Sequence, residues 1–69
     1  MTDHVYKLAE LVGTSHEGSD AAIRVALARA GQTIRHIRWY EVTGQRGFVE
    51  ADGTLQHQVT LKVGFSLED

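Results

Sequence analysis

The sequence contains no cysteine among its 69 residues, which excludes disulfides and thiolate zinc sites. The four histidines lie too far apart along the chain for two of them to reach one ion from adjacent helix turns, so we expect no metal site; they are His4, His16, His36 and His57. A domain of this length buries only roughly 60% of the surface that its unfolded chain exposes. Association with copies of itself is therefore the expected source of further stability.

Signals for several classes of protein are also missing. Acidic and basic residues (Asp3, Lys7 and Glu10) stand where a secretory signal would have an apolar run, and no segment approaches the roughly twenty apolar residues of a membrane span. The formal net charge is −2, whereas a nucleic-acid binder usually carries an excess of basic residues. We expect a cytoplasmic protein with neither nucleic-acid nor membrane partners. Because neither a GxSxG motif nor a P-loop is present, we also expect no enzymatic activity.

The first half of the chain has the pattern of a strand followed by a helix. Strand formers dominate His4–Val12, and Gly13-Thr14-Ser15 gives a turn signal. From Asp20 onward apolar residues recur at the spacing of one helix face, at Ile23, Ala26, Leu27, Ala30 and Ile34. Ser19 and Thr14 are both candidate N-caps. Gly31 falls within this helix, where it implies either a close backbone contact or simple tolerance.

The second half has the pattern of two strands joined by a hairpin. Ile37–Glu50 is rich in strand formers, and Gly44 and Gly47 within it indicate a bulge or a strong bend. Asp52-Gly53 is a hairpin signal, because tight turns need residues that accept positive φ. Thr54–Leu67 then alternates, with an apolar face of Val59, Leu61, Val63, Phe65 and Leu67 and a polar face of Gln58, Thr60, Lys62, Gly64 and Ser66.

These elements predict an α+β fold in one domain spanning 1–69. Because a helix separates the first two strands, they run in the same direction, and the third strand is antiparallel to both. A fully antiparallel sheet then needs the third strand in the middle. The prediction is a β-α-β-β unit in which a three-stranded antiparallel sheet packs on one helix. A single helix covers one sheet face only, so the other must meet water, subunits or a ligand.

Three side chains are candidates for ligand binding. Trp39, the only tryptophan, is either a core or subunit-interface residue or a platform on which a planar heterocycle stacks. Gln58, on the polar face of the last strand, is either solvated or supplies an amide that hydrogen-bonds the edge of such a ring. Arg46 either forms a surface ion pair or binds a phosphate through its guanidinium fork.

The order of segments HVYKLAELVGTS, ALARAGQTIRHIRWYEV, QRG and HQVTLKVGFSLED resembles the dodecin family of small flavin-binding proteins, nearly end to end. The resemblance implies a hollow homododecamer that holds flavins in pairs between subunits. It implies that Trp39 stacks on the isoalloxazine ring opposite its symmetry mate. It further implies that Gln58 hydrogen-bonds the polar edge of the ring, and that Arg46 lies near the phosphate-bearing tail. Gln45, which with Gly44 departs from the family pattern, lies close to the same site.

The function that the resemblance implies is storage and buffering of flavin (FMN, riboflavin or FAD), with protection against flavin photochemistry. Some members also hold coenzyme A, and Lys7 and Arg29 stand at the matching places. Ser66 departs from the family, which often carries a base there. Two alternatives remain open at this point: a structural interaction module without a cofactor, and a flavoenzyme.

Overall fold

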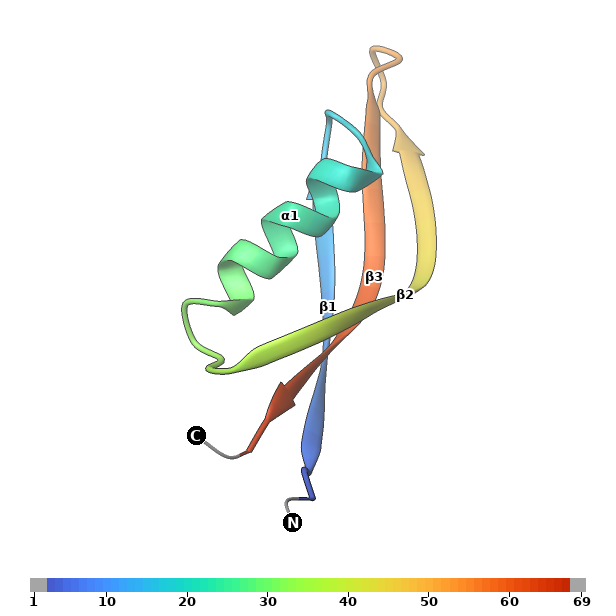
Figure 1. Ribbon diagram of the computed structural model, residues 1–69. Coiled ribbons are helices and arrows are strands. Elements are labelled where there is room, and N and C mark those ends of the chain that lie inside the picture. Colours follow the sequence, from blue (N-terminus) through green and yellow to red (C-terminus); the bar gives the residue numbers. More distant parts are fainter. Residues whose placement is uncertain (1–2, 68–69) are drawn as a thin grey trace.

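The computed structural model describes residues 3–67, so residues 1, 2, 68 and 69 of the expected domain lie outside the described part. In chain order the elements are β1 (Tyr6–Ser15), α1 (Ser19–Ala30), β2 (Ile37–Val49) and β3 (Leu55–Ser66). The strands form one antiparallel sheet in the order β1-β3-β2 (Figure 1). This confirms the predicted α+β fold, its β-α-β-β order and the central position of the third strand.

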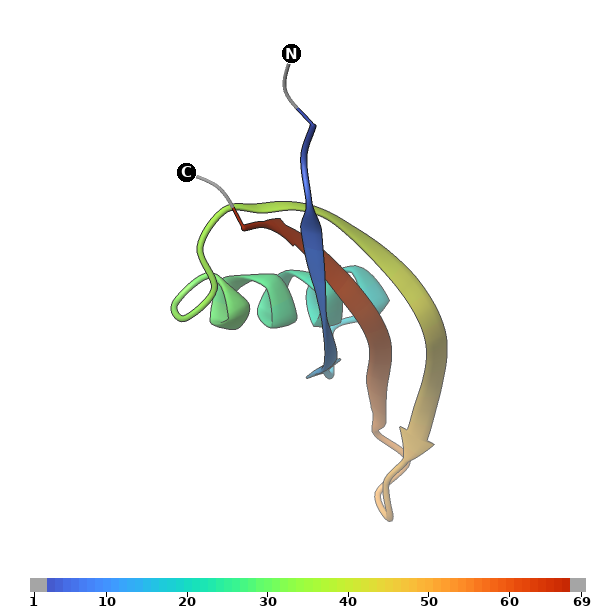
Figure 2. The same ribbon diagram turned by 90° about the horizontal axis from the view of Figure 1, so that it is seen from below.

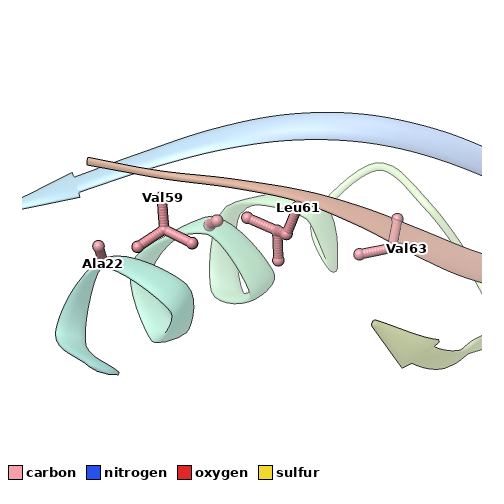
Figure 3. Close-up of a cluster of buried hydrophobic side chains, with 5 residues drawn as sticks. Ala22, Val59, Leu61 and Val63 are labelled. Carbon is pink, nitrogen blue, oxygen red and sulfur yellow. The ribbon is translucent and has the colours of Figure 1, made fainter. Parts of the chain in front are cut away.

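A small core lies between α1 and one face of the sheet (Figures 2 and 3). Val59, Leu61 and Val63 of β3 are fully buried, as the alternation of this strand predicts. They pack against Ala22 and Ala26 of α1, whose small side chains let the helix approach the sheet closely. The predicted alternation fails toward the end of the chain, because Gly64 and Ser66 of the predicted polar face are buried. Leu67 of the predicted apolar face is 58% exposed. No helix in the described part of the chain is long and apolar enough to cross a membrane.

The first strand differs from its predicted extent. It begins at Tyr6 rather than His4, and it continues to Ser15 rather than stopping at Val12. Gly13, predicted as a turn, pairs with Val59 inside the sheet. A Cβ atom on Gly13 would overlap the carbonyl oxygen of Ala22 and lie 2.9 Å from Cβ of Ala26. This glycine is therefore needed because α1 crosses the strand too closely for a side chain.

The predictions for the start of α1 are wrong. The N-cap is Gly18 rather than Ser19 or Thr14, and no side chain caps the helix. The N–H of Ala22 donates to the carbonyl oxygen of Gly18 at 3.0 Å. Gly18 has φ 143°, a region that glycine adopts without steric cost. The backbone conformation between β1 and α1 therefore favours glycine at the N-cap, in place of a residue whose side chain would cap the helix.

The end of α1 is also earlier than predicted. The helix stops at Ala30, so Gly31 is the C-cap, with φ −64° and ψ −15°, rather than an interior residue. A Cβ atom on Gly31 would come no closer than 3.4 Å to the carbonyl oxygen of Leu27, which favours simple tolerance over close contact. Ile34 lies outside the helix but still packs against the core.

Strand β2 is long and strongly curved, as Figure 2 shows. Its pairing with β3 shifts register between Val42 and Gly44, which confirms an irregularity at the predicted glycine. Gly47 keeps the regular register and marks no bulge. A second shift, between Ile37 and Trp39, was not predicted. Bulges bend a strand and increase its twist, so the two shifts account for the curvature of β2.

A hairpin joins β2 to β3 at the predicted Asp52-Gly53 signal. The N–H of Glu50 donates to the carbonyl oxygen of Thr54, and the N–H of Gly53 donates to that of Glu50, both at 2.8 Å. Gly53 has φ 87°, whereas residues 51 and 52 of the same hairpin loop do not have positive φ. The loop is therefore the three-residue type that ends in a left-handed glycine, residues 51–53, rather than a two-residue primed turn. Asp52 accepts a further hydrogen bond from the N–H of Thr54 at 2.9 Å.

The subunit is extended rather than spherical. Its principal dimensions are 56 × 21 × 14 Å, and its radius of gyration is 14.4 Å. A compact domain of 69 residues has a radius of gyration of about 11 Å. The accessible surface of 5032 Å² likewise exceeds the area of about 4300 Å² expected for a folded monomer of 7.6 kDa. The chain leaves surface exposed that a self-sufficient domain would bury.

Candidate functional site

The candidate ligand-binding residues lie on the sheet face opposite α1, which we call the open face. Since Val59, Leu61 and Val63 point toward α1, the alternate residues of β3 project to the open face. Directly paired residues of antiparallel strands project to the same side. The open face therefore holds four rows that cross the sheet: Leu8-Gly64-Trp39, Glu10-Lys62-Glu41, Val12-Thr60-Gly44 and Thr14-Gln58-Arg46.

The indole of Trp39 lies against the backbone of β3 at Gly64. It pairs with Gly64, and a Cβ atom on that glycine would overlap Cε2, Cζ2 and Nε1 of the indole. One face of the indole is therefore covered by Gly64, which is itself buried. The side chain remains 41% exposed, so the indole is not a core residue of the subunit. It presents an aromatic surface on one side only.

Gln58 and Arg46 are brought together as cross-strand neighbours. They are directly paired on the open face, and Thr14 pairs with Gln58 from the other side. Paired residues have Cβ atoms about 5 Å apart, within reach of one small polar group. Gln58 is half-buried and Arg46 is exposed. The row thus combines an amide, a hydroxyl and a guanidinium, which together supply donors and acceptors to a polar ligand edge.

Trp39 is distant from this polar row within one subunit. Its partner Gly64 is separated from Gln58 by six residues along β3, which corresponds to about 20 Å of extended strand. The rows of Lys62 and Thr60 lie between them. That span exceeds the length of the three-ring isoalloxazine system, so a ring stacked on Trp39 does not extend to Gln58 of the same chain.

The structure places Gln45 away from the other three residues. It pairs with Val59, and so its register position belongs to the sheet face that α1 packs on. The adjacent Arg46 belongs to the open face, because successive residues of a strand project to opposite sides. Gln45 is exposed, since α1 packs over β1 and β3 rather than over this part of β2. The sheet itself separates it from the open face.

The two cations implied for coenzyme A also lie away from the open face. Lys7 pairs with Phe65, a position on the α1 side of the sheet. Arg29 is in the last turn of α1. Both are exposed. They therefore share one side of the subunit, with the sheet between them and Trp39.

Charge on the open face is concentrated in one row between the aromatic and the polar ends. There Lys62 of β3 is flanked by Glu10 of β1 and Glu41 of β2. Among residues 3–67 no group of three or more histidine, aspartate or glutamate side chains could hold a metal ion. The surface formed by the same residues has no pocket.

Large apolar side chains are exposed beside the candidate residues. Five of them belong to the open face by register, each with an exposed fraction of at least 41%: Tyr6, Leu8, Val12, Trp39 and Phe48. Others are exposed on the opposite side of β2, where Tyr40 and Val42 are 49% and 42% exposed. Exposed apolar patches of this kind mark surfaces that another molecule covers.

The sequence assigned no part in ligand binding to Gly64 or Thr14, which lie on the open face beside the candidate residues. A glycine in the middle of a strand is itself a signal, because it often marks the close approach of another group. The identity of that group depends on which residue of β2 pairs with Gly64. Since β2 shifts register between Val42 and Gly44, counting back from the hairpin does not give this pairing.

Comparison with known proteins gives a consistent result. Residues 5–68 match the profile of a family described as Dodecin. The chain is 55% identical over 65 residues to a curated protein named Dodecin from Thermus thermophilus, with 94% of each chain covered. A crystal structure of a protein from the same organism has a TM-score of 0.89 and 54% identity, with 97% of this chain and 98% of that chain covered. The structure of dodecin from Streptomyces coelicolor has a TM-score of 0.90 and 48% identity, with coverage of 100% and 99%.

Proposed function

Because the chain belongs to the dodecin family, we propose that it binds flavin between its subunits and catalyses no reaction. The observation that carries the proposal is the Trp39 indole, which is fixed against Gly64 on one side and exposed on the other. A flat, electron-rich surface of this kind favours stacking of a planar heterocycle such as isoalloxazine. Each stacked ring gains about 1–3 kcal/mol, by analogy with bases stacked on aromatic side chains.

The one-sided platform requires a second subunit to enclose the ligand. One indole offers a single free face, so a flavin or flavin pair is sandwiched only when the Trp39 of another copy closes the stack. The polar edge of the ring is then held by Gln58, with Arg46 beside the phosphate-bearing tail. These two residues come from a different chain than the stacking indole, since they lie about 20 Å from it along β3. Gln45, on the other sheet face, would contact a ligand only in an adjoining subunit.

Assembly is the second part of the proposal. We assign the chain to a hollow homododecamer in which its residues form a single flavin-binding domain. The elongated shape and the excess of accessible surface support association with further copies. The exposed apolar residues on both sides of the sheet supply surfaces that such contacts would bury. Homo-oligomers with closed symmetry are the usual outcome of such association.

The proposed role is storage of flavin in a photochemically quiet form. An excited flavin in contact with an indole is quenched by electron transfer before it sensitises damage. Stacking by itself does not distinguish riboflavin, FMN and FAD, whereas Arg46 favours a ligand that carries a phosphate. We further propose that Lys7 and Arg29 contribute to a coenzyme A contact on the α1 side, since both cations are exposed there.

The test is titration of riboflavin and FMN into the flavin-free assembly, followed by quenching of flavin fluorescence, with the native mass measured in parallel. Trp39→Ala should weaken binding about tenfold to a hundredfold, because the stacking contact is lost. Tyr40→Ala is the matched control, since Tyr40 is similarly exposed but lies on the other face of β2. Equal losses in both variants, or unchanged affinity in Trp39→Ala, would contradict the proposal.

A second candidate function is an interaction module that binds no cofactor. It is favoured by one observation: the exposed fraction of Trp39 is close to that of its open-face neighbours, so subunit contacts alone would account for it. The same titration separates the two functions. An assembly of full mass that neither quenches nor retains flavin supports the interaction module.

A further inference from the structure

Gly64 is unusual because the backbone does not require a glycine there. It lies in the central strand, and its φ is not in the positive range that favours glycine. Glycine weakens a strand interior, since it has no side chain to pack and loses more conformational freedom on folding. The structure gives one reason for its presence, namely that the Trp39 indole occupies the place of a side chain.

We infer that Gly64 is a positioning residue for flavin binding: it forms the seat on which the Trp39 indole lies, and so fixes the plane of the stacking surface. This inference rests on the proposed function for its consequence but not for its geometry. A Cβ atom at position 64 would overlap Cε2, Cζ2 and Nε1, which belong to the fused part of the indole. Any larger residue would lift the ring away from β3.

The seat also affects how the ligand binds. An aromatic side chain that covers a cross-strand glycine buries the exposed backbone and is held by that contact. The indole is then restrained in one orientation before the ligand arrives, so less freedom is lost on binding. A lifted indole would move into the space where the flavin lies and would lose its fixed plane. Gly64 thus acts on the ligand only through Trp39.

Gly64→Ala is the informative substitution, with Gly44→Ala as its control. Gly44 lies on the same open face, but a Cβ atom there would be 3.8 Å from Cβ of Thr60, an ordinary contact. Trp39 is the only tryptophan, so its emission reports the seat directly in the flavin-free protein. We expect Gly64→Ala to shift the emission maximum and to change acrylamide quenching, and Gly44→Ala to leave both unchanged.

Flavin affinity then tests the consequence. Gly64→Ala should bind flavin about tenfold more weakly than the original protein, a loss comparable with that of one stacking contact. If the original protein binds no flavin, the proposed function fails, but the emission measurement still decides whether Gly64 seats the indole. Emission and quenching in Gly64→Ala identical to those of the original protein would overturn the inference.

A double variant keeps the test decisive if Gly64→Ala does not fold. Trp39→Phe removes Nε1 and the fused ring, which contain the overlapping atoms. Alanine at position 64 should therefore be tolerated better in Trp39→Phe than beside tryptophan, which a double-mutant cycle detects as coupling. Equal destabilisation by Gly64→Ala in the two backgrounds would show that the indole is not the cause, and the inference would be wrong.

Discussion

Gly13→Ala tests whether the close crossing of α1 over β1 governs the stability of the subunit. The added Cβ atom would overlap the carbonyl oxygen of Ala22 and lie 2.9 Å from Cβ of Ala26, against about 3.5–4.0 Å for carbon atoms in contact. The neighbours are helix atoms rather than flexible side-chain ends, so the helix must retreat by roughly 1 Å. Overpacking of this kind costs about 1–3 kcal/mol. A 69-residue chain loses about 7 °C in melting temperature for each kcal/mol, so a cost near 2 kcal/mol lowers it by about 14 °C.

The matched control for that substitution has the opposite sign. Gly31 has right-handed helical torsions and an unobstructed Cβ position, so Gly31→Ala should stabilise the protein by about 0.4–1 kcal/mol through the unfolded chain. Thermal unfolding of the three proteins is compared by circular dichroism at equal subunit concentration, with the native mass of each confirmed, because assembly contributes to the midpoint. A melting temperature for Gly13→Ala within about 2 °C of the original would refute the tight crossing.

Three further predictions concern the core, the hairpin and one surface contact. Leu61→Ala should cost about 2–5 kcal/mol in denaturant unfolding, since Leu61 is fully buried in a core with few large side chains. The pKa of Asp52 is lowered from 3.8 by hydrogen bonds from the side chain and backbone of Thr54, so its ionised form stabilises the fold above that pH and the gain is lost below it. Asp52→Asn should therefore flatten the fall in melting temperature on acidification below pH 3.8. His16 contacts Glu50 at 3.1 Å with side chains 53% and 42% exposed, so His16→Ala should cost less than about 1 kcal/mol in thermal or denaturant unfolding.

Periodic features of the sequence predict the fold well. The alternation around Val59, Leu61 and Val63 correctly identifies the core face of β3, and the position of β3 between the other strands follows from chain direction alone. Two of the errors fall at glycines. The sequence predicts a turn at Gly13, but this glycine lies in β1 and leaves room for α1 to cross the strand. It predicts that Gly31 lies inside the helix, but Gly31 is the C-cap. A glycine in the sequence can be required either by its own backbone torsion angles or by the close approach of another part of the chain. The sequence does not distinguish the two cases, because the second depends on an element that is distant in the sequence.

The arrangement of the candidate site is harder to predict from the sequence, for a related reason. The polar alternation of β3 assigns Gln58 to the face opposite the core, but the bulge between Val42 and Gly44 decides which residues of β2 share that face. One extra residue reverses the side of every later residue in the strand. Gln45 and Arg46, adjacent in sequence, therefore project to opposite faces, and the pairing of Trp39 with Gly64 emerges only from the completed sheet.

The surface that one chain leaves uncovered is also the surface that carries the proposed ligand-binding residues. A helix of small side chains packs closely over β1 and β3, so the core is thin, and most of β2 and the open face stay uncovered. Under the proposed function Trp39 supplies one side of the flavin stack, and the polar row lies about 20 Å away along β3, so an isoalloxazine ring that uses both contacts more than one chain. A ligand bound only by the assembly stabilises it by mass action, by about 2.7 kcal/mol per site at a hundred times Kd. If flavin binds between subunits as proposed, its occupancy and subunit association are linked, so a substitution that weakens one also weakens the other.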